Sequence, residues 1–444
     1  MSPLRFRLSP FVFCAVSSIV LSQVAAANTL CVNPNVAACY AKIQAAVDAA
    51  SNKDVITVAS GVYKEDVVIG KPLSLLAGPT PTVIDATGLS NGFFVDGYDN
   101  PGLQHVTISG FTVKNAQWEG ILVVSASDVS IRGNTVLNND KAGPVFTGAT
   151  TGCPGQPAFE TDETGDCGGA IHLIGTSRST VSGNITVGNA DGILISDETA
   201  ESHDNMILRN IVVGNPLDCG IVIASHPPVG HTAPPFAAHF GITNNTVAEN
   251  LSSKNGVKVG GAGVGLFSDG NGQGRVSGNV IIHNTLTGNG LPGVALHTHV
   301  GPAFGLPADD MGGNMIIGNF IAGNGADFGD TATPGPTGIN INSGGGGSPV
   351  YGTIISQNEI RDEQVDVAVS TPTHVEVHLN NLMGGNVGVA NVCTLDSAPC
   401  GGTVDASENF WGCAGGPGNI GCSTTTGAGI FTTPWLDNPF GDAP

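Results

Sequence analysis

The chain repeatedly alternates apolar and small or polar residues over short stretches, and each stretch ends at an asparagine that glycine often precedes. The copies cover residues 129–138, 181–197, 208–226, 275–299 and 316–342. Alternation with a period of two is typical of short β-strands, and Gly-Asn pairs indicate turns between them. The copies show no helical periodicity, so the repeat predicts an all-β chain built from stacked units.

A unit of this size cannot bury its own apolar face, which means that successive copies must stack on one another. We expect the chain to wind as a coil, with each strand parallel to its equivalent in the next coil about 4.8 Å away. Asparagines that mark the copies lie at positions 134, 184, 210, 245, 279, 319, 358 and 381. Stacked at a turn, their side chains can hydrogen-bond along the column and tolerate left-handed backbone.

This repeat resembles the right-handed parallel β-helix, or pectin-lyase-like, superfamily. The expected fold class is therefore all-β: a single-stranded right-handed parallel β-helix with an N-terminal capping helix and disulfide-stapled ends. The handedness rests on the resemblance and on the general bias of parallel crossover connections. The resemblance also implies a carbohydrate ligand, although a fold does not fix a function.

Both ends of the coil carry candidate caps. Residues 40–50 form an amphipathic helix pattern, with Ile43, Ala46, Val47 and Ala50 on one face, that would cover the first open coil. Together with the segment 54–78 that follows, this helix resembles the entry segment of the superfamily, over roughly residues 31–85. The far end, at residues 406–417 and 434–436, resembles a closing segment of β-helix proteins, and we expect Trp411 and Trp435 to plug the last coil.

We interpret the chain as one domain behind a secretory signal. Arg5 and Arg7, an apolar run at 11–21 and the small residues 25–27 are typical of such a signal, and no later segment is apolar enough to span a bilayer. The predicted parts are a signal peptide (1–27), an N-terminal cap with the first coils (28–78), β-helix coils with loop insertions (79–392) and a C-terminal cap (393–444). We expect a secreted or periplasmic protein, and the capped ends favour a monomer.

The cysteines agree with export, because disulfides form in oxidising compartments. Eight of them fall into close pairs in the sequence: Cys31 with Cys39, Cys153 with Cys167, Cys393 with Cys400, and Cys413 with Cys422. Zinc-ribbon spacing is absent. The remaining mature cysteine, Cys219, is expected to be buried as a small apolar residue.

The charge balance limits the classes of partner. The formal net charge is −21, and it becomes −23 once the signal with its two arginines and no acidic residue is removed. A negative field argues against nucleic acid and anionic membranes as partners. It also disfavours, without excluding, a polyanionic substrate such as pectate or alginate.

Loop insertions occur at similar points of the repeat, at residues 141–167, 227–239, 301–313 and 325–337, with a glycine run at 344–347. Loops that leave equivalent points of stacked coils should gather on one side. We therefore expect them to wall a groove suited to a chain-like ligand such as a polysaccharide.

An alignment of the strands on Gly192, Gly220, Gly263 and Gly293 brings ionisable residues to one sheet edge. The sixth position of this alignment is occupied by Glu198, His226, Asp269 and His299. Neighbouring members would lie about 5 Å apart and alternate members about 10 Å. The candidate catalytic residues are Asp197, His226, Asp269, His297 and His299.

Such a column of ionisable residues could serve two kinds of chemistry, or it could have no chemical function. Carboxylates about 5–10 Å apart fit acid–base cleavage of a glycosidic bond, with histidines that tune or orient them. Converging imidazoles and carboxylates could instead hold a divalent metal such as calcium, copper or zinc, although the sequence identifies no ligand set. The alternative is a solvated strand edge, where Asp, His, Ser and Thr are common turn residues.

Other residues are candidates for contact with the substrate. The insertions contribute His231, His239, Asp309 and Asp310, and Trp118 could stack on a sugar or pack under a loop. Lys254 and Lys258 are candidate bases for a lyase. His172 and His283 are more simply explained as structural residues.

Two functional hypotheses remain open. Polygalacturonase-like, pectate lyase and mannuronan epimerase signatures are absent: His231 in Gly-His is followed by Thr232, and the Asp-Asp pair at 309–310 lies in a loop. The first hypothesis is an exported protein that binds, and cleaves or epimerises, a polysaccharide, as a hydrolase, lyase or epimerase. The second is a non-catalytic β-helix scaffold or a periplasmic metal-handling protein.

Overall fold

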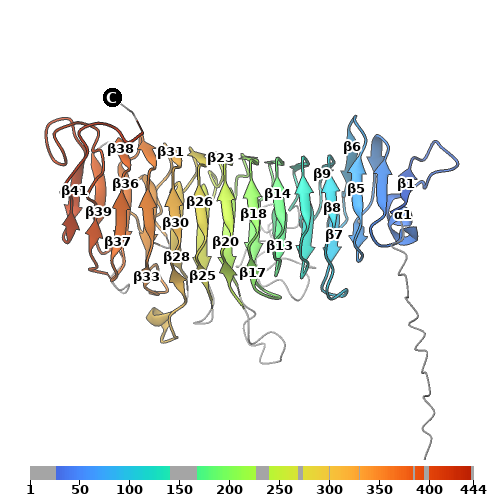
Figure 1. Ribbon diagram of the computed structural model, residues 1–444, viewed down its shortest axis with the longest axis horizontal. Coiled ribbons are helices and arrows are strands. Elements are labelled where there is room, and N and C mark those ends of the chain that lie inside the picture. Colours follow the sequence, from blue (N-terminus) through green and yellow to red (C-terminus); the bar gives the residue numbers. More distant parts are fainter. Residues whose placement is uncertain are drawn as a thin grey trace, which may run out of the picture.

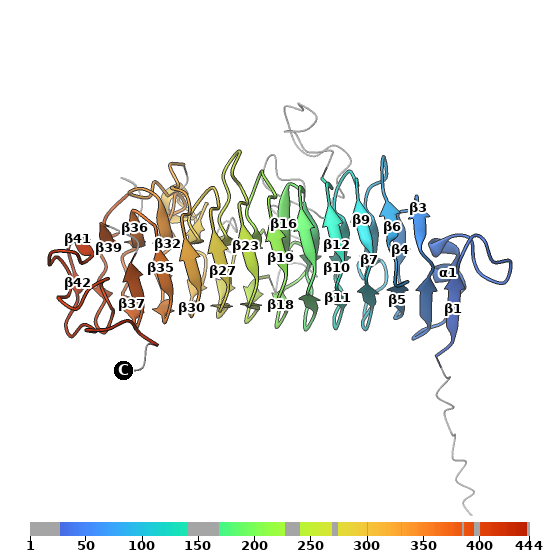
Figure 2. The same cartoon turned by 90° about the horizontal axis from the view of Figure 1, so that it is seen from above.

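The computed structural model describes residues 27–140, 168–226, 240–268, 274–299, 301–329, 331–383, 386–394 and 400–441. These residues wind as a right-handed parallel β-helix, whose coils run from the N-terminal end at the right of Figure 1 to the C-terminal end at the left. Figure 2 shows the same stack from above. The predicted fold class is confirmed, since the paired strands of the described residues are parallel and most of them lie in three long sheets.

A typical coil contributes one strand to each long sheet, in the order C, A, B. Sheet A contains β1 (Thr29–Val32), β2 (Val55–Val58), β5 (Ser74–Ala77), β8 (Thr107–Ser109), β11 (Ser130–Arg132), β14 (Thr180–Ser182), β18 (Met206–Leu208), β22 (Thr246–Ala248), β26 (Val280–Ile282), β30 (Met315–Ile317), β34 (Ile354–Ser356), β37 (Val375–His378), β40 (Val404–Asp405) and β42 (Ile430–Phe431). Sheet B contains β3 (Gly61–Tyr63), β6 (Thr82–Asp85), β9 (Thr112–Lys114), β12 (Thr135–Leu137), β15 (Ile185–Val187), β19 (Ile211–Val213), β23 (Leu251–Ser253), β27 (Thr285–Thr287), β31 (Phe320–Ala322), β35 (Glu359–Arg361) and β38 (Asn381–Met383).

Sheet C carries the longer strands of the middle coils. It contains β4 (Val67–Ile69), β7 (Phe93–Asp96), β10 (Ile121–Val124), β13 (Gly169–Ile174), β16 (Asp191–Ser196), β20 (Ile221–Ser225), β24 (Val264–Ser268), β28 (Val294–Thr298), β32 (Thr337–Asn342), β36 (Val365–Ser370), β39 (Val387–Asn391) and β41 (Thr424–Gly427). Smaller pairings join β17 (Ser202–His203), β21 (Ile242–Thr243) and β25 (Val276–Ser277), and also β29 (Met311–Gly312) and β33 (Val350–Tyr351). Two short helices complete the described elements, α1 (Ile43–Ala49) and the 3-10 helix η1 (Pro302–Phe304).

The core consists of rows of aliphatic side chains that stack from coil to coil. In sheet C, for example, Ile193, Ile221, Val264 and Val294 occupy equivalent positions in successive strands, and all four are fully buried. Each such side chain contributes roughly 1.5–3 kcal/mol of burial free energy. The apolar positions of the alternating sequence are therefore those whose side chains point into the coil.

Buried asparagines form three ladders along the turns. In each step, the side-chain oxygen of one asparagine accepts hydrogen bonds from the backbone N–H and the side-chain amide of its equivalent in the preceding coil, as Asn210 does for Asn184. The ladder between sheets A and B runs through Asn134, Asn184, Asn210, Asn250, Asn284, Asn319, Asn358, Asn380 and Asn409. The ladder between sheets B and C runs through Asn139, Asn189, Asn215, Asn255, Asn289, Asn324 and finally Glu363. A third, shorter ladder runs through Asn205, Asn245, Asn279 and Asn314.

The prediction that stacked asparagines hydrogen-bond along the turns is confirmed, but some of the asparagines predicted to form the column belong elsewhere. Asn245 and Asn279 belong to the third ladder, and Asn380, not Asn381, continues the first. The expected left-handed backbone lies one residue earlier, at the residue before the ladder asparagine, as at Gly183 (φ 61°) and Arg209 (φ 55°). Glycine adopts this conformation without a steric penalty, which explains the frequent Gly-Asn pairs.

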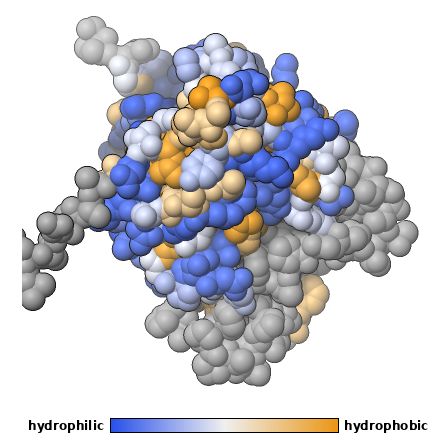
Figure 3. All heavy atoms as spheres, turned by 90° about the vertical axis from the view of Figure 1, so that its right-hand side faces the viewer, coloured by the Kyte–Doolittle hydropathy of each residue, from blue (hydrophilic) through white to orange (hydrophobic). Residues whose placement is uncertain are grey.

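The caps agree with the sequence analysis at one end and only partly at the other. Helix α1 buries Ile43, Ala46 and Val47 against the first coil, and Figure 3, which views this end, shows hydrophilic and hydrophobic residues interspersed on the surface. At the far end Trp411 is fully buried, as predicted, but the prediction for Trp435 was wrong. Trp435 is 39% exposed because its ring lies over the backbone of Gly416 in the closing loop, outside the coil.

Three of the predicted disulfides are present, Cys31–Cys39, Cys393–Cys400 and Cys413–Cys422. The pair of Cys153 and Cys167 lies outside the described residues. Cys219 is a buried free thiol, as predicted. Helix α1 has seven residues, and within the described part of the chain no helix is long and apolar enough to cross a membrane.

The glutamate that ends the second ladder makes a pH-dependent contribution to stability. Burial raises the pKa of Glu363 to about 7, although its carboxylate accepts two hydrogen bonds from Asn324. A carboxyl group with a raised pKa favours folding most below its unfolded pKa, and this contribution is lost as the pH rises through the folded value. We expect Glu363→Gln, which keeps an acceptor and removes the charge, to stabilise the protein at pH 8 by roughly 1–3 kcal/mol.

Thermal unfolding at pH 5 and pH 8 checks this prediction. The variant should gain melting temperature over the wild type at pH 8 and little at pH 5. An equal gain, or no gain, at both values would show that the charge of Glu363 does not carry the effect.

Candidate functional site

The described loops that could frame a site leave both edges of sheet C. The segment at 301–310, with η1, follows β28, whereas the segment at 325–336 precedes β32. The insertions at 141–167 and 227–239 lie outside the described residues. The prediction that the loops gather on a single edge was therefore wrong, because the insertions lie both before and after strands of sheet C. The groove that they could frame lies on the outer face of that sheet.

The register on which the candidate column depends is confirmed. Ile193, Ile221, Val264 and Val294 are successive partners, so the glycine before each of them is equivalent to the others. Glu198, His226 and His299 therefore follow their strands at the same position. Asp269, the member between His226 and His299, lies outside the described residues.

A pocket of about 770 Å³ opens on the outer face of β20, β24 and β28. Its floor includes Val222, Ala224 and Phe267, which project outward from the strands. One wall comes from the turns at 256–260 and 290–291 and from residues 326–329, and the imidazoles of His226, His297 and His299 lie at the opposite edge. The structure thus brings three of the five predicted catalytic residues to one cavity.

His297 and His299 form a hydrogen-bonded pair. Their Nε2 atoms are 2.8 Å apart, so one ring donates the proton that the other accepts. The ring of Phe267 packs against both, with centroid distances of 4.5 Å to His297 and 5.6 Å to His299. An imidazole pair that shares a proton, held in place by an aromatic ring, is suited to proton transfer.

Asp197 does not reach this pocket. Its carboxylate is fully buried and accepts hydrogen bonds from the Ser225 hydroxyl at 2.8 Å and the His226 backbone N–H at 2.7 Å. Burial raises its pKa to about 6, against the opposing effect of the Ser225 hydrogen bond. Asp197 therefore fixes the backbone that carries His226 and is a positioning residue in this arrangement.

Exposed apolar side chains line the wall opposite the histidines. Phe328 is 81% exposed, and Val257 and Val259 are 56% and 70% exposed. Large exposed apolar residues gathered around one pocket indicate a ligand with apolar faces. Phe328 and Phe267 supply ring surfaces at the rim and on the floor.

Two carboxylates and one lysine also line the pocket. The Asp327 carboxylate accepts hydrogen bonds from the Gly329 N–H and the Thr331 hydroxyl, so it shapes its own loop. Asp218 accepts from the Cys219 N–H at 2.6 Å. Lys258 belongs to the wall, whereas Lys254, the other proposed lyase base, occupies the left-handed position (φ 57°) before the ladder residue Asn255.

The remaining predicted substrate-binding residues lie elsewhere. Trp118 is 2% exposed, which leaves no ring face for a sugar, and packing under a loop describes it better. Asp309 is buried and accepts from the Ser268 hydroxyl and the Gly274 N–H, whereas Asp310 binds Arg275 and the Tyr351 hydroxyl. Both stabilise the loops beyond β24 and β28. His231 and His239 lie outside the described residues.

A second polar group on the same face surrounds His172, which the sequence analysis explained as a structural residue, and its partners Glu119 and Ser196 were missed. The His172 imidazole lies 3.3 Å from the Glu119 carboxylate through Nδ1 and 2.8 Å from the Ser196 hydroxyl through Nε2, and all three side chains are fully buried. Asp191 takes the same turn position as Gly169 in the preceding coil. Because the acidic residue falls just before the strand glycine in Glu119-Gly120 and Asp191-Gly192, an alignment extended one residue upstream would have found both.

Phe267, Phe328 and Asp218 were also missed. Phe267 lies at the position equivalent to His297, so the alignment already in use would have identified it. Phe328 and Asp218 lie in turns outside the repeat, and their approach to the pocket depends on how those turns fold. Among the described residues, no group of three or more His, Cys, Asp or Glu side chains is arranged to hold a metal ion.

These features define a right-handed parallel β-helix protein with a pocket on the outer face of one sheet. The family model for the right-handed β-helix region matches residues 91–232. A search of curated proteins found no match.

Two solved structures are similar in fold. The catalytic unit of a thermostable GH87 α-1,3-glucanase from Streptomyces thermodiastaticus strain HF3-3 has a TM-score of 0.54 and 16% identity, over 90% of this chain and 67% of that chain. The catalytic domain of a GH87 α-1,3-glucanase in complex with nigerose has a TM-score of 0.52 and 14% identity, over 91% of this chain and 68% of that chain. At these identities the likeness concerns the fold.

The buried position of Asp197 predicts that its removal affects stability. Asp197→Ala leaves the Ser225 hydroxyl and the His226 N–H without this acceptor. Each buried donor that loses its hydrogen bond lowers the free energy of unfolding by roughly 1–3 kcal/mol. We expect the free energy of unfolding, measured in urea, to fall by roughly 2–5 kcal/mol. Phe328→Ala, at a largely exposed side chain of the pocket wall, is the control and should change it by less than about 1 kcal/mol. Equal effects of the two substitutions would contradict this placement of Asp197.

Proposed function

We propose that this protein binds a neutral polysaccharide in the pocket over β20, β24 and β28 and hydrolyses its glycosidic bonds there. The single observation that carries the proposal is the pocket itself. It combines exposed aromatic and aliphatic walls with a row of imidazoles on the opposite edge. Sugar rings have apolar faces and polar edges, so they match a site with both kinds of surface.

Charge favours a neutral substrate. The chain has 36 acidic and 15 basic residues, and Lys258 is the one lysine or arginine among the described pocket residues. A uronic acid polymer would be repelled by the net field, and its cleavage by elimination would need cations to neutralise its carboxylate. Hydrolysis of an uncharged glycan needs neither. The α-1,3-glucanases named among the similar folds are consistent with this substrate class.

The imidazoles supply the proton transfers. His226 and His299 follow equivalent strands two coils apart, which corresponds to about 10 Å along the stack. This is close to the separation of about 6.5–9.5 Å that leaves room for a water molecule in inverting glycosidases. In the proposed reaction the His297–His299 pair donates a proton to the leaving sugar oxygen as the C–O bond breaks. His226 takes a proton from the water that attacks the anomeric carbon.

The protein acts outside the cytoplasm in this proposal. The basic and apolar start of the chain supports a secretory signal, and three disulfides in the described residues support an oxidising compartment. A polysaccharide substrate is consistent with that location. No specific observation in the described residues favours the alternative of a metal-handling protein.

A screen against neutral and acidic polysaccharides, with and without calcium, tests the proposed function. New reducing ends without unsaturated products are expected on a neutral glycan. His299→Ala should lower kcat by roughly 100-fold or more while it leaves the melting temperature within about 2 °C. Unsaturated products would replace the proposal with a lyase. Binding of a glycan without turnover would leave a carbohydrate-binding scaffold.

A further inference from the structure

A second cavity, which we call the Tyr351 cavity, lies at the edge of sheet A and shares no residue with the pocket on sheet C. Its volume is about 380 Å³, and it is lined by Tyr351, residues 352–354, Thr373, His374 and Glu376. Tyr351 belongs to the coil that directly follows the coil of His299, so its coil lies about 5 Å further along the stack. The cavity is large enough for a small ligand, since ligand pockets span roughly 300–1,000 Å³.

The ring of Tyr351 is held in place and is still open to solvent. Tyr351 pairs with Gly312 of the preceding coil, and its ring lies over this glycine, where a Cβ atom would come within 2.3 Å of the ring. The Tyr351 hydroxyl donates to the Asp310 carboxylate at 2.6 Å, and the Arg275 Nε–H donates to the same carboxylate at 3.2 Å. Tyr351 is nonetheless 48% exposed. A ring that is already fixed loses little freedom when a ligand stacks on it.

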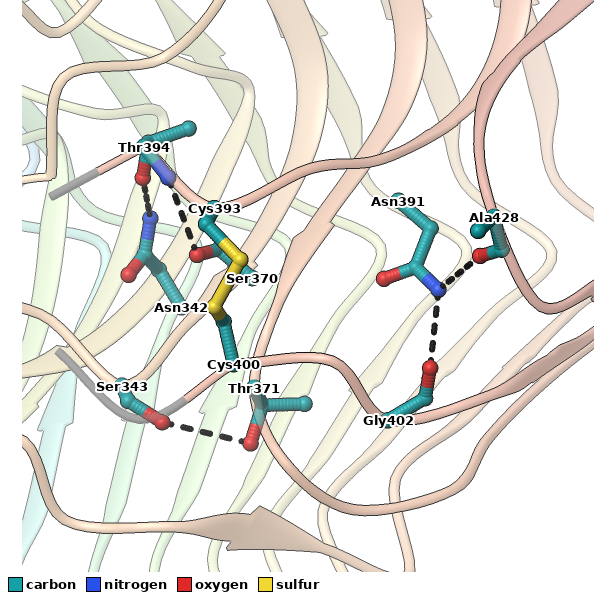
Figure 4. Close-up of a disulfide and its surroundings, with 10 residues drawn as sticks. All are labelled: Asn342, Ser343, Ser370, Thr371, Asn391, Cys393, Thr394, Cys400, Gly402 and Ala428. Carbon is teal, nitrogen blue, oxygen red and sulfur yellow. Dashed lines mark hydrogen bonds between the residues drawn. A yellow bond between two sulfur atoms is a disulfide. The ribbon is translucent and has the colours of Figure 1, made fainter. Parts of the chain in front are cut away.

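The turn at 371–374, which forms the opposite wall, is fixed as well. The Thr371 hydroxyl accepts a hydrogen bond from the Val350 N–H at 3.1 Å, which ties the turn to the residue before Tyr351. The Ser343 hydroxyl donates to the same hydroxyl at 3.3 Å, as Figure 4 shows. The Gly402 N–H of the following coil donates to the Thr371 carbonyl at 2.9 Å. The shape of the cavity is therefore set before a ligand binds.

The polar groups of the cavity fit a neutral ligand that is rich in hydroxyls. His374 and Glu376 are exposed and lie two positions apart at β37, so their side chains project from the same face. The Glu376 carboxylate accepts hydrogen bonds, and the His374 imidazole, whose Nδ1 lies 2.8 Å from the Thr403 hydroxyl, presents Nε2. The described residues that line the cavity include no lysine or arginine, so an anionic ligand would meet a carboxylate without a counter-charge.

We propose that the Tyr351 cavity is a second carbohydrate-binding site, which holds one neutral sugar residue with its ring face on Tyr351 and its hydroxyls on Glu376 and His374. This inference rests on the proposed function and adds a site that binds the polysaccharide without cleaving it. Two sites on one protein raise the affinity for a chain that reaches both, because the second contact becomes intramolecular. The Tyr351 cavity thus favours long chains over short oligosaccharides.

Calorimetric titration with two probes tests this inference: the neutral polysaccharide identified by screening, and a trisaccharide of the same sugar and linkage. Tyr351→Ala should weaken binding of the polysaccharide by roughly tenfold, because the stacking contact and the second attachment are lost together. The trisaccharide is too short to gain from two sites, so its affinity should change by less than about twofold. Glu376→Ala, which removes the carboxylate of the cavity, should have the same pair of effects.

Two further variants separate the ring from the loop that carries it. Tyr98→Ala is the matched control, since it removes a tyrosine that is 40% exposed and lines neither cavity, and it should leave both affinities unchanged. Tyr351→Phe keeps the ring and loses the hydrogen bond to Asp310, and it should keep most of the affinity for the polysaccharide. An equal loss in Tyr351→Phe and Tyr351→Ala would overturn the inference, because the order of the loop and not the ring would then carry the effect.

The same titrations distinguish failure of this inference from failure of the proposed function. If Phe328→Ala weakens binding of the polysaccharide whereas Tyr351→Ala and Glu376→Ala do not, the inference is overturned and the proposed function stands. The reverse pattern would support the second site and refute the assignment of the pocket. Absence of binding by the wild type would refute both.

Discussion

The coil-to-coil register is the constraint on which the structure depends, and the asparagine ladders hold it. Each ladder asparagine satisfies two donors of its neighbour, so a shift of one coil against the next would leave buried polar groups unpaired in each of the ladders it joins. A slip by one residue would also turn every core side chain outward. Polar turns and apolar rows therefore enforce the same register.

The pocket follows from this register and not from any local motif. Val222, Phe267 and His297 are separated by tens of residues in the sequence, yet they meet because β20, β24 and β28 are neighbours in sheet C. The coil is a rigid frame, and the turns between strands supply the variable part. Phe328 comes from one such turn, the loop before β32, which is tied to that strand by the hydrogen bond from the Asn340 amide to the Thr331 hydroxyl.

The sequence predicted what the repeat encodes. The strands, the core rows, the asparagine ladders in general and the equivalence of His226 and His299 follow from periodicity. Three disulfides follow from cysteines that are close in the sequence. Asp197 does not line the pocket because the Ser225 hydroxyl and the His226 backbone N–H bind its buried carboxylate, which spacing does not reveal. Phe328 and Asp218 were missed because turn conformation, not period, places them. The prediction that Trp435 plugs the last coil was wrong because the closing loop that carries its contacts folds outside the coil.

The most direct test of the account is the affinity of two phenylalanine variants for the neutral glycan identified by screening. Phe328 and Phe304 are both exposed on loops at sheet C, but only Phe328 lines the pocket. Calorimetric titration should show that Phe328→Ala weakens binding by roughly tenfold, the equivalent of about 1.4 kcal/mol, while Phe304→Ala leaves it unchanged. Wild-type affinity in Phe328→Ala, or an equal loss in both variants, would contradict the claim that this pocket holds the glycan.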